Sequence, residues 1–127
     1  MKNNALQASL VVAGFAAAFG IGVGNAEAST ATDFISHISA DSQKVTKQYN
    51  LYSSVQMAQA SLESAWGQST LSTKANNYFG IKGSYNGQSV DMLTAEYTTN
   101  GELYYTVAQF KKYPSPYESL NDNAALL

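Results

Sequence analysis

The spacing of apolar residues changes along the chain, from a glycine-interrupted apolar run near the start to helical periods, then to strands, and finally to a helix. Phe34, Ile38, Val45 and Tyr49 recur at near-helical spacing, which predicts a helix over 33–49. Two strand-like runs at 90–97 and 102–110 flank the turn dipeptide Asn100-Gly101, a strong short hairpin signal. The pattern therefore predicts helices and one hairpin.

The second helix is predicted to begin with a capping box formed by Ser53 and Gln56 and to stop at Gly67. In this register one face of the helix is apolar, and Glu63 lies at the edge of that face. The residues predicted to form the apolar face are Val55, Ala58, Leu62, Ala65 and Trp66. Trp66 is expected to belong to the core.

Glu63 is the first candidate for chemistry. A carboxyl group beside an apolar face loses part of its hydration, which raises its pKa toward the range that a general acid needs near neutral pH. The alternative is an ordinary solvated Glu on a helix surface, and spacing by itself leaves both readings open.

The hairpin and the last helix carry further expectations. A two-residue turn at Asn100-Gly101 would pair Thr99 with Glu102 and Glu96 with Tyr105. A final helix is predicted from Ser115-Pro116-Tyr117-Glu118, which combines a cap, a first-turn proline and an acidic third position.

Residues 1–28 have the features of a secretory signal peptide. A lysine follows Met1, a small and apolar run extends from about residue 8 to 24, and Ala26-Glu27-Ala28 matches a cleavage pattern. The alternative is an uncleaved membrane anchor, which the short, glycine-interrupted run disfavours. Cleavage would leave one small domain, residues 29–127, with no further membrane segment, and would place it outside the cell or at the cell wall.

Composition excludes several classes of function. The chain has a net charge of −2 and contains no arginine, so it lacks the basic stripe of a nucleic-acid-binding protein. It has no cysteine, which excludes disulfides, and His37 is its one histidine. We therefore expect neither a metal site nor a cofactor.

The apolar run at 124–127 ends the predicted last helix without a cap. Exposed leucines at a helix end are unusual in a finished domain, so we expect the domain at 29–127 to be incomplete at its C-terminus. The alternative is that this end of the helix docks onto the core.

Four ordered segments resemble the motifs of bacterial N-acetylglucosaminidase autolysins, the mannosyl-glycoprotein endo-β-N-acetylglucosaminidase-like group that includes the flagellar muramidase-like enzymes. The resemblance covers roughly 34–127 and lacks the tyrosine-bearing segment with which the family usually continues. The motifs are Ala58-Gln59-Ala60-Ser61-Leu62-Glu63-Ser64-Ala65-Trp66-Gly67-Gln68-Ser69, Asn76-Asn77-Tyr78-Phe79-Gly80-Ile81-Lys82-Gly83, Thr94-Ala95-Glu96-Tyr97 and the run from Phe110 to Leu120.

The resemblance implies a lysozyme-like α+β fold, in which a helical body and a small β-hairpin lobe flank a substrate groove. It implies hydrolysis of the β-1,4 bond after N-acetylglucosamine in peptidoglycan, with Glu63 as general acid and Glu96 as the second acidic residue. Glu102 and Asp91 are rivals for that second place. Since the two glutamates belong to separate lobes, we expect their carboxyl groups to lie farther apart than the roughly 5 Å of a retaining pair.

Aromatic side chains with polar tips suit sugar-binding grooves. The candidates for substrate contact are Tyr78, Phe79, Tyr105 and Tyr113. Two functions remain open: a secreted hydrolase acting on peptidoglycan glycan strands, and a non-catalytic wall-binding remnant that keeps the groove.

Overall fold

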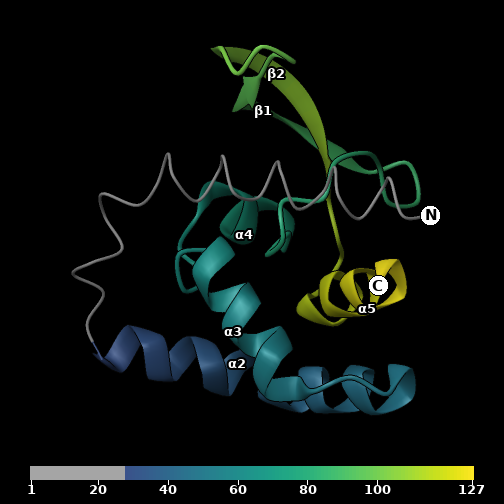
Figure 1. Ribbon diagram of the computed structural model, residues 1–127. Helices are drawn as coiled ribbons and strands as arrows, with labels where there is room; N and C mark the ends of the chain where they lie inside the picture. The colour runs from purple at the N-terminus through teal and green to yellow at the C-terminus, as the bar shows by residue number, and fades with distance from the viewer. Residues whose placement is uncertain (1–27) are drawn as a thin grey trace.

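The computed structural model describes residues 28–127, which form a helical body and a hairpin that rises from it as a separate lobe (Figure 1). The predicted α+β class is therefore confirmed. The elements are α2 (Ala28–Tyr49), α3 (Ser53–Glu63), α4 (Thr70–Ala75), β1 (Ser89–Tyr97), β2 (Leu103–Lys111) and α5 (Pro116–Leu126). Of the predicted signal peptide, residues 1–28, residues 1–27 lie outside the described part of the chain. Within 28–127 no helix is long and apolar enough to cross a membrane.

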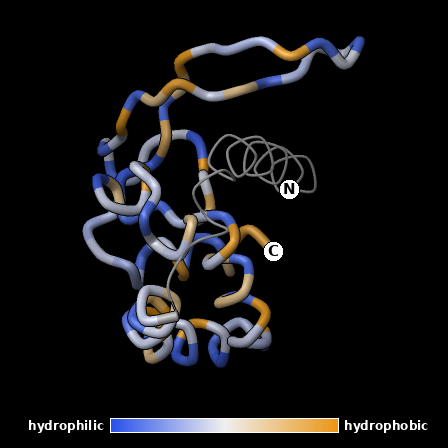
Figure 2. The backbone as a smooth tube through the Cα atoms, turned by 90° about the vertical axis from the view of Figure 1, so that its left-hand side faces the viewer, coloured by the Kyte–Doolittle hydropathy of each residue, from blue (hydrophilic) through white to orange (hydrophobic). Residues whose placement is uncertain are grey.

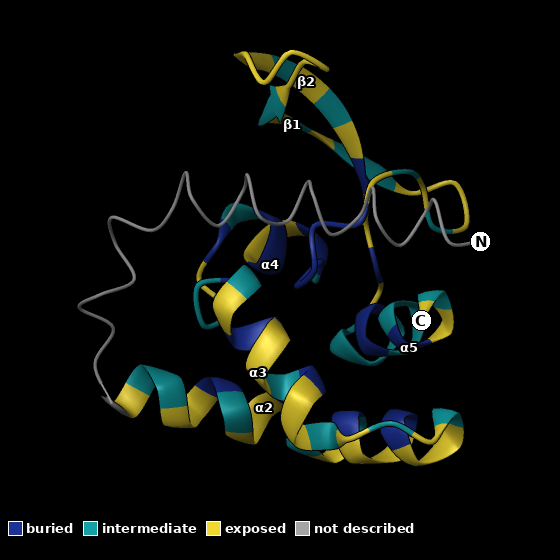
Figure 3. Ribbon diagram, viewed as in Figure 1, coloured by how far each residue is buried: buried dark blue, intermediate teal, exposed yellow. Residues whose placement is uncertain are grey.

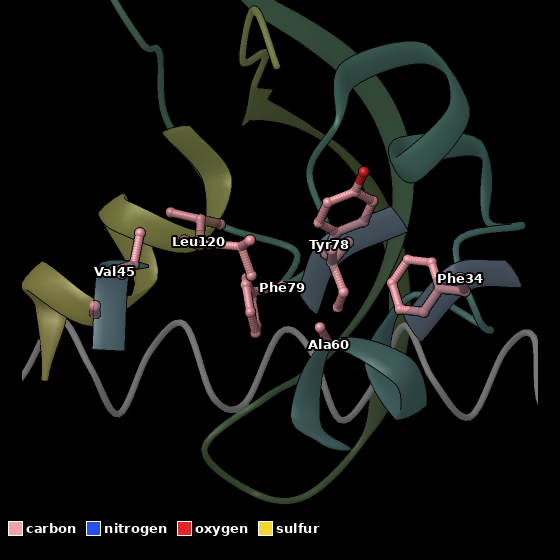
Figure 4. Close-up of a cluster of buried hydrophobic side chains, with 9 residues drawn as sticks. Phe34, Val45, Ala60, Tyr78, Phe79 and Leu120 are labelled. Carbon is pink, nitrogen blue, oxygen red and sulfur yellow. The ribbon is translucent and has the colours of Figure 1, made fainter. Parts of the chain in front are cut away.

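The core lies where α2, α3, α5 and the loop after α4 meet. Phe34, Ile38 and Val45 point inward from α2, as their spacing predicted, and Leu120 and Ala124 point inward from α5. Figure 4 shows Phe34, Tyr78 and Phe79 among the buried side chains of this core. Phe34 and Tyr78 meet edge to face, with ring centroids 5.4 Å apart.

Helix α3 buries a different face from the predicted one. Leu62 is 67% exposed and Val55 also faces solvent, whereas Gln56, Ala60 and Ser61 are buried. Figure 3 shows the exposed and buried stripes along this helix. The apolar pattern was misleading because small side chains let α2 and α3 approach closely, and the polar Gln56 is satisfied inside.

Gln56 ties three helices together instead of closing a capping box. Its carbonyl oxygen accepts a hydrogen bond from Ser42 Oγ at 2.9 Å, and its Nε2 donates to the Leu120 carbonyl at 2.9 Å. It also donates to Asn123 at 3.2 Å. The first residue before α3, Tyr52, makes no side-chain cap. The predicted capping box at Ser53 is therefore wrong.

The segment after α3 contains a helix that the sequence analysis missed. Ser69 caps α4 by accepting a hydrogen bond from the Ser72 amide at 3.1 Å. The loop beyond α4 is irregular, and the side chain of Asn77 fastens it through three hydrogen bonds. Asn77 Oδ1 accepts from the Ile81 amide at 3.0 Å, and its Nδ2 donates to the carbonyl groups of Ile81 and Lys111.

The hairpin forms as predicted, but its register differs by one residue. Glu96 pairs with Tyr104, not with Tyr105, because the connection spans 98–102 and is longer than a two-residue turn. A shift of one residue moves side chains to the opposite face of the sheet. The tube in Figure 2 shows the hairpin leaving the helical body as an extended arm.

One face of the hairpin packs on the body and the other is open. Val90, Met92 and Ala108 pack around buried Leu71 and Phe110, so this inner face rests on α4. The outer face exposes large apolar side chains: Leu93, Tyr97, Leu103, Tyr105 and Val107. The structure thus sets which hairpin residues lie on the side of α4.

The final helix begins at Pro116, as predicted. The hydroxyl group of Ser115 donates to the Glu118 carboxylate and makes no cap to the backbone. Leu126 packs against the core, whereas Leu127 is exposed. The apolar end of α5 is therefore partly docked.

Candidate active site

Glu63 is the last residue of α3, and the chain turns sharply directly after it. Its side chain is half-buried, and this burial raises the pKa of Glu63 from 4.5 to about 7. The negative end of the helix dipole acts in the same direction, and the last turn of α3 holds no basic residue. The predicted rise in pKa is confirmed, although a different face of α3 is buried.

The turn after Glu63 is held in an uncommon conformation. Ala65, Trp66 and Gly67 all have positive φ angles, of 53°, 56° and 77°. The Trp66 amide donates to the Ser61 carbonyl at 2.8 Å, and the Gly67 amide donates to Ser64 Oγ at 2.8 Å. Such strain persists where surrounding contacts hold it, often at functional sites. The helix therefore ends at Glu63, not at the predicted Gly67.

Gly67 also lies against the core. A Cβ atom there would come within 2.5 Å of Phe34 Cδ1. Only glycine satisfies both the backbone angle and this contact. The position of Glu63 thus depends on a turn that packs against the ring of Phe34.

Glu96 lies near the tip of β1, on the same face as buried Thr94, and this face rests on α4 lower down. Its carboxylate forms an ion pair with Lys82 of the loop after α4. Of the two rivals, Asp91 lies on the opposite face of β1 and Glu102 lies in the exposed connection.

The four aromatic candidates occupy different environments. Phe79 is 2% exposed and belongs to the core, so the structure does not support its expected contact with substrate. Tyr113 is equally buried, and its hydroxyl group donates to Asp122 at 2.6 Å. Burial and this bond raise the pKa of Tyr113 well above its usual value. It touches only the edge of a cavity of about 340 Å³ beside Tyr85.

Tyr105 is displaced by the register shift. It is 64% exposed on the outer face, opposite to the face of Glu96. Tyr104, which the sequence analysis missed, lies directly across from Glu96 and is 46% exposed. The length of the connection between the strands decides this pairing. A five-residue connection, in place of the predicted two-residue turn, pairs Glu96 with Tyr104.

Tyr78 lines a cavity of about 550 Å³ between α2, the turn at Trp66-Gly67 and α4. Burial and the nearby Asp41 raise the pKa of Tyr78 to about 12, so its hydroxyl group keeps its proton. His37 lies at the rim of this cavity. Within the described residues no His, Cys, Asp and Glu side chains gather in a group that could hold a metal ion.

Glu63 and Glu96 carry carboxyl groups in different environments. The carboxyl group of Glu63 is half-buried and its pKa is raised to about 7, whereas the carboxylate of Glu96 is ion-paired with Lys82. Glycoside hydrolysis requires one carboxyl group that donates a proton and a second group that manages water or positive charge.

Comparison with known proteins supports this chemistry. Residues 39–127 match the family described as mannosyl-glycoprotein endo-beta-N-acetylglucosaminidase. An autolysin of Enterococcus faecalis is 52% identical over 97 residues, which cover 76% of this chain and 13% of that protein. The exo-glucosaminidase LytG of Bacillus subtilis is 43% identical over 93 residues, covering 73% of this chain and 33% of its own length.

Solved structures agree in fold. The catalytic domain of the autolysin Auto from Listeria monocytogenes superposes with a TM-score of 0.73 at 50% identity, covering 78% of this chain and 56% of that one. A C-terminally truncated glycoside hydrolase domain of Salmonella typhimurium FlgJ gives a TM-score of 0.60 at 32% identity, covering 76% and 67%. The chain spans a third or less of the two curated relatives described above.

Proposed function

Because the chain belongs to the mannosyl-glycoprotein endo-β-N-acetylglucosaminidase family, we propose that it hydrolyses peptidoglycan, with Glu63 as the general acid. The observation that carries the proposal is the half-buried carboxyl group of Glu63, whose pKa is raised to about 7 at the centre of the signature segment. The proposed bond is the β-1,4 linkage after N-acetylglucosamine.

In this mechanism Glu63 donates its proton to the leaving glycosidic oxygen as the bond breaks. Glu96, which is ion-paired with Lys82, either accepts a proton from the attacking water or stabilises the oxocarbenium-like sugar. Tyr104 of β2 lies directly opposite Glu96 of β1, and its ring stacks on a sugar of the substrate. The strained turn at Ala65-Trp66-Gly67 sets the direction of the Glu63 side chain.

The test is the loss of turbidity of purified cell walls, measured with the wild-type chain, Glu63→Gln and Glu102→Gln. Glu63→Gln removes the proton donor without changing size, so we expect the rate to fall by about a hundredfold or more. Glu102→Gln is the matched control, since Glu102 lies in the exposed connection of the hairpin. Near-normal activity of a folded Glu63→Gln variant would contradict the assignment.

The products identify the bond. Some relatives are called probable N-acetylmuramidases, among them a Lactococcus lactis protein that is 45% identical over 95 residues. Reduction of the new ends with borohydride followed by mass spectrometry should yield reduced N-acetylglucosamine. Reduced N-acetylmuramic acid would instead show cleavage at the other glycosidic bond.

A second candidate is a wall-binding module without catalysis. It is favoured by one observation: the hairpin exposes the rings of Tyr97, Tyr104 and Tyr105, side chains of a kind that stack on sugars without any catalysis. Sedimentation with purified walls would then retain the chain although turbidity stays constant. Release of soluble glycan fragments would exclude this candidate.

The site of action follows from the same proposal. We propose that residues 1–28 direct export and are removed, so that the protein acts outside the cell or at the wall. Mass spectrometry of exported protein should show Ser29 as the first residue. A peptide containing Met1 or Lys2 in exported material would contradict this.

A further inference from the structure

We infer that Lys82 is a positioning residue, which holds the curved hairpin over the helical body and thereby sets the place of the Glu96 carboxylate. The inference rests on the proposed function, because it assigns a role to Glu96 in hydrolysis. It begins from the ion pair between Lys82 and Glu96, which joins the loop after α4 to strand β1 of the hairpin.

The backbone around Lys82 is held by several contacts with strand β2. Lys82 forms a bridge with Phe110, supported by hydrogen bonds from the Gly83 amide to Gln109 at 3.0 Å and from the Lys111 amide to Ile81 at 2.9 Å. The side chain of Asn77 accepts a hydrogen bond from the Ile81 amide and donates one to the Ile81 carbonyl group. Lys82 is thus fixed at the base of the hairpin.

Glu96 lies near the far end of the hairpin, away from these contacts. Phe110 pairs with Val90, and Glu96 lies six residues farther along β1, near the tip. Within the described residues the sheet has two strands, and an isolated two-stranded ribbon is at best marginally stable by itself. The tip therefore needs a further contact to hold one position.

The ion pair requires the hairpin to bend. Six residues of straight strand span about 20 Å, farther than a lysine and a glutamate side chain reach together. The contact between Lys82 and Glu96 therefore forms only when the ribbon curves back toward its own base. Figure 1 shows this curvature in the long arrow of β2.

The consequence concerns catalysis. Without Lys82 the ribbon would lose the one ion pair that the described residues place on its inner face, and Glu96 would sample several positions. A displacement of about 1 Å of a reacting group costs on the order of a hundredfold in rate. Lys82 touches the reaction only through Glu96.

The kinetic test uses the full chain with Lys82→Met, Lys82→Arg, Glu96→Gln and the double variant Lys82→Met with Glu96→Gln. We expect Lys82→Met to lower kcat at least tenfold with little change in KM, and Lys82→Arg to restore most of it. In the Glu96→Gln background the same change should cost nothing further, since interacting residues are not additive. Lys74→Met is the control, because Lys74 is an exposed lysine of α4.

A second readout does not depend on activity. The chain contains no cysteine, so spin labels at Thr99→Cys and Gln43→Cys report the distance between hairpin tip and α2 without competing thiols. The distribution should be narrow in the parent and Lys82→Arg, and broad in Lys82→Met and Glu96→Gln.

Unchanged distributions in Lys82→Met would overturn the inference, as would an effect on KM alone or equal losses in both backgrounds. Glu63→Gln is assayed beside these variants. An active Glu63→Gln variant contradicts the proposed function, whereas an inactive one beside a fully active Lys82→Met variant contradicts only the role of Lys82.

Discussion

At the scale of single residues, the environment of one carboxyl group governs the chemistry. Glu63 combines partial burial with a place at the negative end of α3, and both favour its protonated form. The turn that follows holds three consecutive residues at positive φ. The proposed proton donor and the strained turn that follows it are therefore neighbours in sequence.

The pKa of Glu63 makes both stability and activity depend on pH. Between pH 4.5 and about 7 the unfolded chain has lost this proton while the folded chain keeps it, so the folded state becomes less stable as the pH rises. We expect Glu63→Gln to be more stable than the parent at pH 8 by about 1–2 kcal/mol, allowing for the remaining solvent contact, and equal at pH 4. Urea denaturation at the two pH values measures the difference.

Activity should follow the same group. Since the general acid must be protonated, kcat/KM on cell walls should fall about tenfold per pH unit above pH 7. A stability difference that is the same at pH 4 and pH 8, or activity that is flat to pH 9, would show that Glu63 is solvated like an ordinary surface carboxylate.

Gly67 provides a test of the turn. Gly67→Ala places a methyl group 2.5 Å from the Phe34 ring at a φ angle of 77°, and we expect a loss of about 2–4 kcal/mol of unfolding free energy. Gly87→Ala is a matched control, because φ is 79° there and no atom lies within 4 Å. Equal losses in thermal unfolding would mean that contact with Phe34 contributes nothing.

At the scale of elements, hydrophobic spacing identified α2 and both strands but predicted the wrong buried face for α3, and the proline of the first turn identified the start of α5. Long elements with large core residues are predictable because burial and periodicity agree. In α3 the buried side is made of Gln56, Ala60 and Ser61, which small size and hydrogen bonds make compatible with the interior. Such a face has no signature in the apolar pattern.

The register of the hairpin predicts which tyrosine serves the substrate. Tyr104 lies across from Glu96 on the inner face, so Tyr104→Ala should raise KM for wall glycans about three- to tenfold, as the loss of about 1 kcal/mol of aromatic stacking would. Tyr105→Ala changes the same residue type on the outer face and should leave KM unchanged. The reverse result from steady-state kinetics would restore the register predicted from the sequence.

At the scale of the whole molecule, two apolar faces remain exposed within the described residues. One runs along the outside of α3 through Val55 and Leu62, and the other covers the outer hairpin face through Leu93 and Val107. Contiguous apolar surface promotes association. A net charge of −2 gives only weak electrostatic repulsion between chains, so these exposed apolar faces favour association.

These faces predict concentration-dependent association. Val55→Glu combined with Leu93→Glu should lower the sedimentation-average mass at high protein concentration while leaving the melting temperature within a few degrees, since both side chains are exposed. Gln59→Glu with Gln109→Glu adds the same charge at exposed polar positions and serves as the control. If both pairs lower association equally, net charge and not apolar surface is responsible.

The sequence by itself determined the family, the order of most elements and the position of Glu63 in its signature segment, because these depend on local spacing and on motifs that are contiguous in the chain. Only the tertiary structure decided which face of α3 is buried and that Phe79 and Tyr113 belong to the interior. It also decided that Tyr104, not Tyr105, shares a face with Glu96, and that Lys82 reaches Glu96. These features depend on contacts between segments far apart in the chain, where burial, hydrogen bonding and the curvature of the sheet outweigh local preference.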